Sequence, residues 1–192
     1  MEEDVELLPL YILPTIGYVE KLISNLPFQM ALGERYRKQT DRSRFQIAGP
    51  NNLQVLSLPI VHPGNYAAMA EVKLNNNENW QIKHWRSIET SYRKAPFFEY
   101  YAHHFEPLFQ KKYGLLAEIS IEAIYIIFKI LKFEKRIVLN FSNQRTISPI
   151  NAEGKIQYQQ VFIERHGFIP DVSILDLIFN EGPNAMEFLK RI

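Results

Sequence analysis

Residues 45–58, Phe-Gln-Ile-Ala-Gly-Pro-Asn-Asn-Leu-Gln-Val-Leu-Ser-Leu, combine two short apolar runs with a strong turn signal between them. The first run covers Phe45–Ala48, the turn signal covers Gly49–Asn52, and the second run covers Leu53–Leu58. Two such runs around Gly, Pro and Asn are typical of paired antiparallel strands. We therefore expect a β-hairpin here, within a sheet that is mostly antiparallel.

The rest of the first half also contains short apolar runs bounded by turn residues. Leu7–Leu13 stops at a proline, Phe28–Leu32 has the character of a buried strand, and Met69–Leu74 alternates between apolar and charged residues as a half-buried strand does. Thr15 can cap a helix that continues to Ile23. Strands therefore dominate the first half.

The second half has helical patterns. They predict helices at Trp80–Lys94, at Phe98–Lys112, at Ile121–Phe133 after a Ser120 cap, and in a final helical hairpin opened by the capping box Ser173–Asp176. Strands gather before helices instead of alternating with them, which argues against a doubly wound fold. We expect an α+β fold in which a mostly antiparallel sheet from the N-terminal half is covered by helices from the C-terminal half. Residues 1–192 are expected to form a single domain.

Composition restricts the classes of partner. The 192 residues carry a formal net charge of +1, so no long-range field attracts nucleic acid, and the absence of cysteine excludes disulfides and thiolate chemistry. The N-terminus is acidic, and the most apolar stretch, Ile119–Leu131, is interrupted by Glu122 and Lys129 and is too short to span a bilayer. We expect a cytoplasmic protein with no nucleic-acid partner and no stable membrane insertion.

A basic run stands out against this near-neutral balance. Residues 35–44, Arg-Tyr-Arg-Lys-Gln-Thr-Asp-Arg-Ser-Arg, hold five cations. In an extended segment, one face would carry Lys38, Thr40, Arg42, Arg44 and Gln46, while Phe45 and Ile47 would face the core. Such a row could bind carboxylate or phosphate oxygens, or it could be a solvated, salt-bridged strand.

Two further segments carry candidate acid–base groups. His84 shares a predicted helix face with Ile88 and Tyr92. It could act as a base beside a cleft, or it could be a packed structural residue. Glu164, Arg165 and His166 lie in succession before a glycine, where they could surround one turn, or Glu164 and Arg165 could simply form a solvated ion pair.

No metal or cofactor is predicted. His103 and His104 are adjacent, so they point to different sides of a helix, and the sequence contains no HExxH pattern. It also lacks the GxGxxG, Walker and GxSxG motifs, which gives no support to nucleotide-binding folds or to the serine-hydrolase elbow.

The order of the motifs resembles the WbqC-like protein family. The resemblance is carried by Tyr-Ile-Leu-Pro-Thr-Ile-Gly-Tyr at 11–18, the basic run from 38, Leu-Ser-Leu-Pro-Ile at 56–60, and His-Trp-Arg-Ser-Ile-Glu-Thr-Ser-Tyr-Arg-Lys-Ala-Pro-Phe-Phe at 84–98. Residues 158–182 look like the C-terminal signature of the form found in Bacteroidetes. The likeness covers about residues 11–182.

The resemblance implies specific positions. The family pattern Lys-x-x-Tyr-Arg-Asn-Arg falls on Lys38, Arg42 and Arg44, with Asp41 and Ser43 in place of the usual Tyr and Asn. The family histidine falls on His84, followed by Tyr92 and the Pro-Phe-Phe turn. A lysine expected after Ile-Ser-Pro is Ile150 in this chain.

The resemblance also implies a role in surface-polysaccharide (O-antigen-type) biosynthesis, plausibly as a transferase acting on a sugar nucleotide or amino-sugar intermediate. The expected ligand is a small anionic metabolite, a sugar nucleotide or an acyl donor. The implied anion-binding residues are Lys38, Arg42 and Arg44; the acid–base residues are His84, Glu164 and His166; and the residues lining the site are Tyr11, Tyr92 and Gln160. The alternative is a non-catalytic protein that binds an anionic metabolite or acts as a scaffold, with His84 buried.

Overall fold

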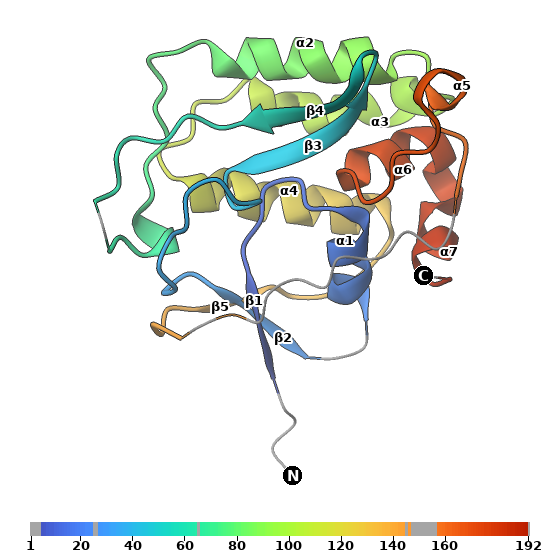
Figure 1. Cartoon of the computed structure of the whole chain (residues 1–192). Coiled ribbons are helices and arrows are strands. Elements are labelled where there is room, and N and C mark those ends of the chain that lie inside the picture. The colour runs from blue at the N-terminus through green and yellow to red at the C-terminus, as the bar shows by residue number, and fades with distance from the viewer. Residues whose placement is uncertain (1–4, 25–26, 65, 145, 147–156, 192) are drawn as a thin grey trace.

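The computed structural model describes residues 5–24, 27–64, 66–144, 146 and 157–191. Strands β1 (Glu6–Pro9), β2 (Phe28–Ala31) and β5 (Val138–Asn140) form a small sheet in the order β1-β2-β5. Strands β3 (Arg44–Gly49) and β4 (Asn52–Ser57) form a separate hairpin. Figure 1 shows the hairpin beside the long helices, with the three-stranded sheet at the other end of the molecule.

The expectation of a mostly antiparallel sheet is wrong, although the mixture of helices and strands is confirmed. Among the strands of the described residues, β2 pairs in parallel with both β1 and β5, whereas β3 and β4 pair in the antiparallel sense. Parallel strands need a crossover connection, and helix α1 (Ile16–Ile23) supplies it between β1 and β2. The chain then completes the hairpin and three helices before β5 joins the sheet.

The hairpin itself is confirmed. Gly49 pairs with Asn52 across the turn, and the register continues to Arg44 opposite Ser57. Phe45 and Ile47 are buried on β3, as the alternation predicts. Asn52 has φ +93°, a backbone conformation that asparagine tolerates better than most residues.

Helices account for most of the second half. They are α2 (Trp80–Tyr92), α3 (Phe98–Phe105), η2 (Glu106–Phe109), α4 (Leu116–Ile130), α5 (Ile163–His166), α6 (Ile174–Glu181), η3 (Gly182–Asn184) and α7 (Ala185–Leu189). Among the described residues, no helix is long and apolar enough to cross a membrane.

Two predicted elements differ from the structure. Met69–Leu74 is not a strand: it begins as the 3₁₀ turn η1 (Met69–Glu71), because its alternating burial is also satisfied by a short turn. α4 begins at Leu116, and Ser120 lies inside it. The carboxylate of Glu118 instead accepts hydrogen bonds from the backbone N–H groups of Gly114 and Leu115, at 3.0 and 2.9 Å.

The predicted N-caps Thr15 and Ser173 are confirmed, but Asp176 does not complete a capping box, because the Ser173 N–H donates to the Gln46 carbonyl. The hydroxyl of Thr15 accepts a hydrogen bond from the Tyr18 N–H, and that of Ser173 accepts one from the Leu175 N–H. The two cap residues form an isolated antiparallel bridge, and the Ser173 hydroxyl donates to the Leu13 carbonyl. The C-terminal helices are therefore fixed against the segment that connects β1 to α1.

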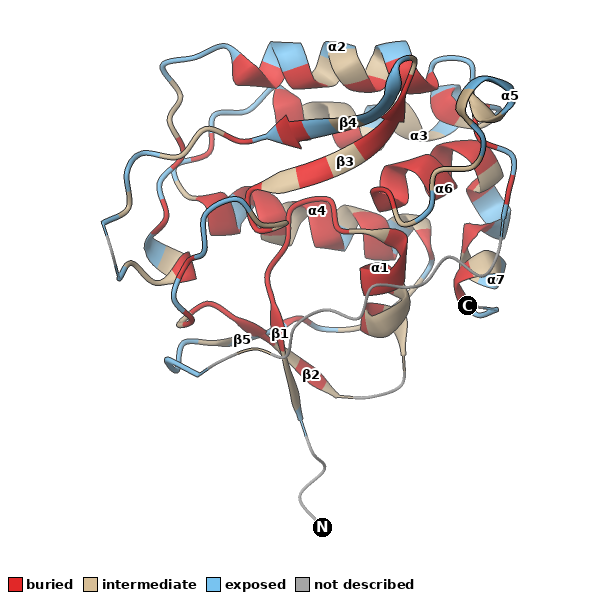
Figure 2. Ribbon diagram, in the orientation of Figure 1, coloured by how far each residue is buried: buried red, intermediate tan, exposed pale blue. Residues whose placement is uncertain are grey.

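The buried apolar residues form one cluster that extends from β1 and β2 to the helices. Figure 2 shows buried residues throughout α6 and on the inward sides of α2 and α4. Exposed residues gather on the outer side of α2 and in the loops around the first half of the chain.

Candidate anion-binding site

The basic run does not form the extended row that the sequence suggested. Residues 38–43 form turns, and only Arg44 belongs to a strand. Gln39 has φ +61°, and the Thr40 hydroxyl donates to the Arg37 carbonyl at 2.8 Å. These local hydrogen bonds curl the backbone, so the cations point in different directions.

Arg42 turns inward and forms a buried ion pair with Glu34. The exposed fractions of the two side chains are 4% and 3%. Nε and Nη2 of Arg42 donate to the same Glu34 oxygen at 2.9 and 2.5 Å, while the other oxygen accepts from the Thr146 hydroxyl at 2.8 Å. The Tyr11 ring lies 5.6 Å from the guanidinium carbon. The charge of Arg42 is therefore used inside the protein.

Three other cations of the basic run, Arg35, Arg37 and Lys38, line a pocket of about 670 Å³. This volume lies within the range of about 300–1,000 Å³ that is typical of small-molecule sites. We call it the basic pocket; it is lined by Glu34, Arg35, Tyr36, Arg37, Lys38, Pro63, Gly64, Asn143 and Gln144. Arg37 and Lys38 are exposed, and Glu34 already holds Arg42. The excess charge of the pocket is therefore positive.

The basic pocket lies beyond the carboxyl ends of parallel strands. β2 ends at Ala31, shortly before the residues 34–38 that line it, and β5 ends at Asn140, shortly before Asn143 and Gln144. Because β2 and β5 are parallel neighbours, both segments leave the sheet at the same edge. Ligands of open α/β sheets bind at that edge.

Gly33 allows the chain segments that follow β2 and β5 to lie against each other. A Cβ at this position would lie 2.1 Å from the Phe141 carbonyl oxygen. The N–H groups of Leu32 and Gly33 donate to the Asn140 carbonyl at 2.7 and 3.1 Å. The close approach sets the distance between the two walls of the basic pocket.

His62 stands at the rim of the pocket and was missed by the sequence analysis. Its Nδ1 accepts from the Gly64 N–H at 3.2 Å, so in the neutral ring the proton lies on Nε2. That nitrogen faces Lys38 Nζ at 3.3 Å. Two donors then face each other, an arrangement suited to sharing one oxygen of an anion. The available sequence signal was a histidine next to Pro-Gly, in a loop.

An exposed aromatic ring lies beside these groups. The side chain of Tyr66 is 81% exposed, and the Arg35 guanidinium carbon is 4.6 Å from its ring centroid. Arg35 also lines the basic pocket. An exposed ring next to a cationic pocket offers a face for a nucleobase or sugar ring.

His84 lies away from the lining of the basic pocket. It is buried against β3, where its ring meets the Phe45 ring edge-on at 6.1 Å and the Trp80 ring at 5.4 Å. Burial, assisted by the nearby positive charge of Lys83, lowers the pKa of His84 to about 4. The imidazole is therefore neutral at pH 7, but it faces the core.

Three residues expected to line the site are buried structural groups. The Tyr11 ring contacts the Tyr18 ring in a tilted arrangement, with the ring centroids 4.7 Å apart, and burial raises the pKa of Tyr11 to about 12. The Tyr92 hydroxyl accepts from the Ala48 N–H at 3.2 Å. The Gln160 amide bonds both backbone groups of Ile169, at 2.8 and 2.9 Å. The structure does not bring these side chains to the lining of the basic pocket.

The C-terminal acid–base candidates lie on α5. Glu164 is exposed, and Nε2 of His166 contacts the Pro50 carbonyl at 2.8 Å, at the tip of the hairpin. Arg44 is half-buried on β3. None of these three residues lines the basic pocket, whereas Lys38 does.

The structure describes two of the three positions where this chain departs from the family pattern, Asp41 and Ser43. The Asp41 carbonyl accepts from the Ile12 N–H, and burial raises the pKa of the Asp41 carboxyl although Arg42 lowers it. The Ser43 hydroxyl shares a hydrogen bond with the Tyr36 hydroxyl at 2.7 Å. Ile150 lies outside the described residues.

The fold and the basic pocket define a small mixed α/β protein with a candidate anion site at a sheet edge. The chain belongs to the WbqC-like protein family, whose model matches residues 10–148. That range includes every residue that lines the basic pocket, while Gln160, Glu164 and His166 lie beyond it.

One curated relative is similar over almost its whole length. It is a protein of Mycobacterium tuberculosis named "Uncharacterized protein Rv1507c", 21% identical over 219 residues that cover 93% of this chain and 94% of the relative. No solved structure matches the chain.

Proposed function

We propose that this protein binds a phosphate-bearing metabolite of the sugar-nucleotide class in the basic pocket, as part of surface-polysaccharide biosynthesis. The observation that carries the proposal is the convergence of Arg35, Arg37 and Lys38 on one pocket at the carboxyl edge of a parallel sheet. Guanidinium and ammonium groups are the preferred partners of phosphate oxygens.

Besides its cations, the basic pocket has amide groups in its lining and an aromatic ring near its rim. The amides of Asn143 and Gln144 can bond sugar hydroxyls or a base edge, because each carries both donors and an acceptor. Tyr66 offers an aromatic face near the rim. A diphosphate between two ring systems matches this combination better than a simple carboxylate does.

The reaction we propose is group transfer to or from the bound metabolite. For proton transfer we propose His62 instead of His84, since His62 contacts Lys38 beside the pocket while His84 is enclosed by rings. Because Nδ1 of His62 already accepts from the Gly64 N–H, the neutral ring offers its Nε2–H, and His62 is the candidate proton donor to the leaving oxygen. The alternative, a binding or scaffolding protein without turnover, uses the same pocket without needing His62 as a proton donor.

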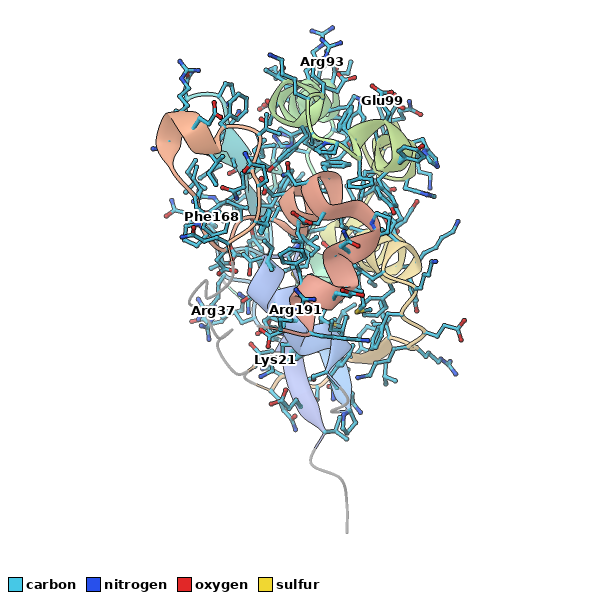
Figure 3. The ribbon with its side chains drawn as sticks, turned by 90° about the vertical axis from the view of Figure 1, so that its right-hand side faces the viewer. Lys21, Arg37, Arg93, Glu99, Phe168 and Arg191 are labelled. Atoms are coloured by element: carbon cyan, nitrogen blue, oxygen red, sulfur yellow. The ribbon has the colours of Figure 1, made fainter. Side chains whose placement is uncertain are left out.

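A thermal-shift screen tests the binding step. UDP-glucose, other nucleoside diphosphate sugars, an acyl-coenzyme A and inorganic phosphate are compared on the wild-type chain and on Arg37→Ala. Arg93→Ala is the matched control, because this exposed arginine does not line the basic pocket and lies far from Arg37 in Figure 3. We expect a nucleotide-sugar shift that Arg37→Ala reduces and Arg93→Ala retains. Equal loss in both variants would contradict the assignment.

The chemical step is tested separately with His62→Gln. If the protein is a transferase, this variant keeps the thermal shift but loses turnover of the sugar nucleotide that the screen identifies. Full turnover in His62→Gln excludes the assignment of His62 as the proton donor. Binding without turnover in the wild-type chain, across amine and hydroxyl acceptors, supports the non-catalytic alternative.

A further inference from the structure

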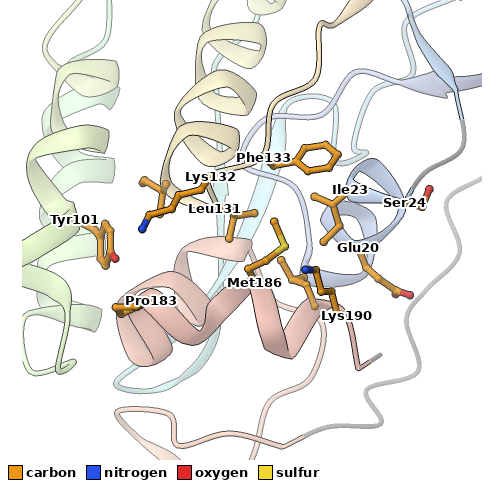
Figure 4. Close-up of a pocket in the computed structure, with 13 residues that line it drawn as sticks. Glu20, Ile23, Ser24, Tyr101, Leu131, Lys132, Phe133, Pro183, Met186 and Lys190 are labelled. Atoms are coloured by element: carbon orange, nitrogen blue, oxygen red, sulfur yellow. The ribbon is translucent and has the colours of Figure 1, made fainter.

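A second cavity lies at the other end of the molecule, where α1, α3, α4 and α7 meet. Its volume is about 720 Å³, and it shares no residue with the basic pocket. We call it the apolar cavity; Figure 4 shows its lining, which consists of Glu20, Ile23, Ser24, Tyr101, Ile130, Leu131, Lys132, Phe133, Gly182, Pro183, Met186, Leu189 and Lys190.

The floor of this cavity is hydrocarbon and thioether. Leu131 and Leu189 are buried within it, and Ile23, Phe133 and Met186 remain half-buried. In Figure 4, Met186 lies in the middle, between Leu131 and Ile23. Met has three rotatable bonds and a polarisable sulfur, so it adapts to irregular apolar ligands. The floor therefore suits a flexible alkyl chain.

The two ends of the apolar cavity differ in charge. At one end Lys132 extends toward Tyr101 (Figure 4). At the other end one cationic residue, Lys190, and one anionic residue, Glu20, both line the cavity, so their formal charges cancel. Lys132 immediately follows the C-cap of α4. The end of a helix carries roughly half a negative charge, which the full charge of Lys132 exceeds. The Lys132 end is therefore the one suited to an anion.

We propose that the apolar cavity binds a single-chain amphiphile with an anionic head. The head lies between the Lys132 ammonium and the Tyr101 hydroxyl, and the alkyl chain runs over Leu131 and Met186 toward Ile23. The proposal is independent of the basic pocket, since the two sites share no residue.

The chain-length dependence of binding tests the apolar part. Octyl, decyl and dodecyl phosphate are titrated by calorimetry at concentrations where each is monomeric. We expect saturable binding of one molecule, tightened by roughly two- to fourfold for each added methylene group. In the Arg37→Ala/Lys38→Ala background, where the basic pocket is disabled, inorganic phosphate and dodecyltrimethylammonium, the matched cation, should not bind. Affinity independent of chain length, or equal binding of the cation, would overturn the proposal.

Lysine variants test the position of the head. Both lysines are exposed, so their replacement leaves the core intact. Lys132→Gln should weaken dodecyl phosphate by about five- to tenfold, while Lys190→Gln should leave it unchanged. The reverse order, or equal effects, would refute the placement. Arg37→Ala should bind dodecyl phosphate as the wild-type chain does, which separates this result from any failure of the basic pocket.

Discussion

At the scale of single residues, the Arg42–Glu34 pair shows how a cation that resembles a ligand-binding group can be structural. Removing one partner of a buried ion pair leaves the other charge without compensation and costs about 3–5 kcal/mol. We expect Arg42→Met and Glu34→Met each to lower the free energy of unfolding by about this amount. The double variant Arg42→Met/Glu34→Met should recover most of the loss. Urea unfolding of the three variants measures both effects, and additive losses would contradict the pairing.

His84 should make stability depend on pH. Its folded pKa of about 4 lies below the ordinary value of 6.5, so the unfolded chain binds the proton first. The stabilising contribution of the neutral His84 imidazole is present above pH 6.5 and is lost as the pH falls toward 4. The lowered pKa corresponds to a loss of up to about 3 kcal/mol.

The raised pKa of Asp176 changes stability with pH in the opposite direction, so its contribution must be distinguished from that of His84. Burial raises the pKa of the Asp176 carboxyl to about 6 from 3.8, although hydrogen bonds from Tyr158 and its neighbours lower it. Its stabilising contribution is full below pH 3.8 and disappears as the pH rises through 6. The test is therefore the difference between wild-type and His84→Gln in urea midpoint, measured from pH 7 to pH 4. We expect this difference to move in favour of the variant on acidification; a constant difference would contradict a buried neutral imidazole.

At the scale of elements, Gly33 lets the segments after β2 and β5 approach closely, and this approach determines the shape of the basic pocket. Gly33→Ala places a Cβ 2.1 Å from the Phe141 carbonyl oxygen, so backbone must move. We expect a loss of about 1–3 kcal/mol in the free energy of unfolding, together with weaker ligand binding in the basic pocket. Gly114→Ala is the control, because its added Cβ would meet only the Glu118 carboxylate, at 3.7 Å. Equal behaviour of the two variants in unfolding and ligand titration would contradict this role for Gly33.

The sequence correctly predicted the elements that have strong local signals. The hairpin around Gly49–Asn52, the helix capped by Thr15 and the helix capped by Ser173 are all present. The buried strand at Phe28–Leu32 was predicted, but the parallel pairing and β5 were missed, because strands of three or four residues are too short to show a period or a partner. β5 in particular has two exposed residues and one half-buried residue, so it lacks a hydrophobic signature.

At the scale of the whole molecule, the site was only partly predictable. The charge density of residues 35–44 identified the right segment, but the spacing did not show which cations would be free. Arg42 is paired because the fold brings Glu34 to it, and His62 and Asn143 approach from distant parts of the chain. These juxtapositions depend on the parallel pairing of β2 with β5 and on the turns of residues 38–43, neither of which local patterns specify.

We propose that the basic pocket recognises phosphate, and titration calorimetry with inorganic pyrophosphate measures this recognition without a sugar or a base. The wild-type chain and Arg93→Ala should bind with the same affinity. Arg37→Ala/Lys38→Ala should bind roughly 10- to 100-fold more weakly, because charge-assisted hydrogen bonds are lost. Retained pyrophosphate affinity in the double variant, with unchanged thermal stability, would contradict the account.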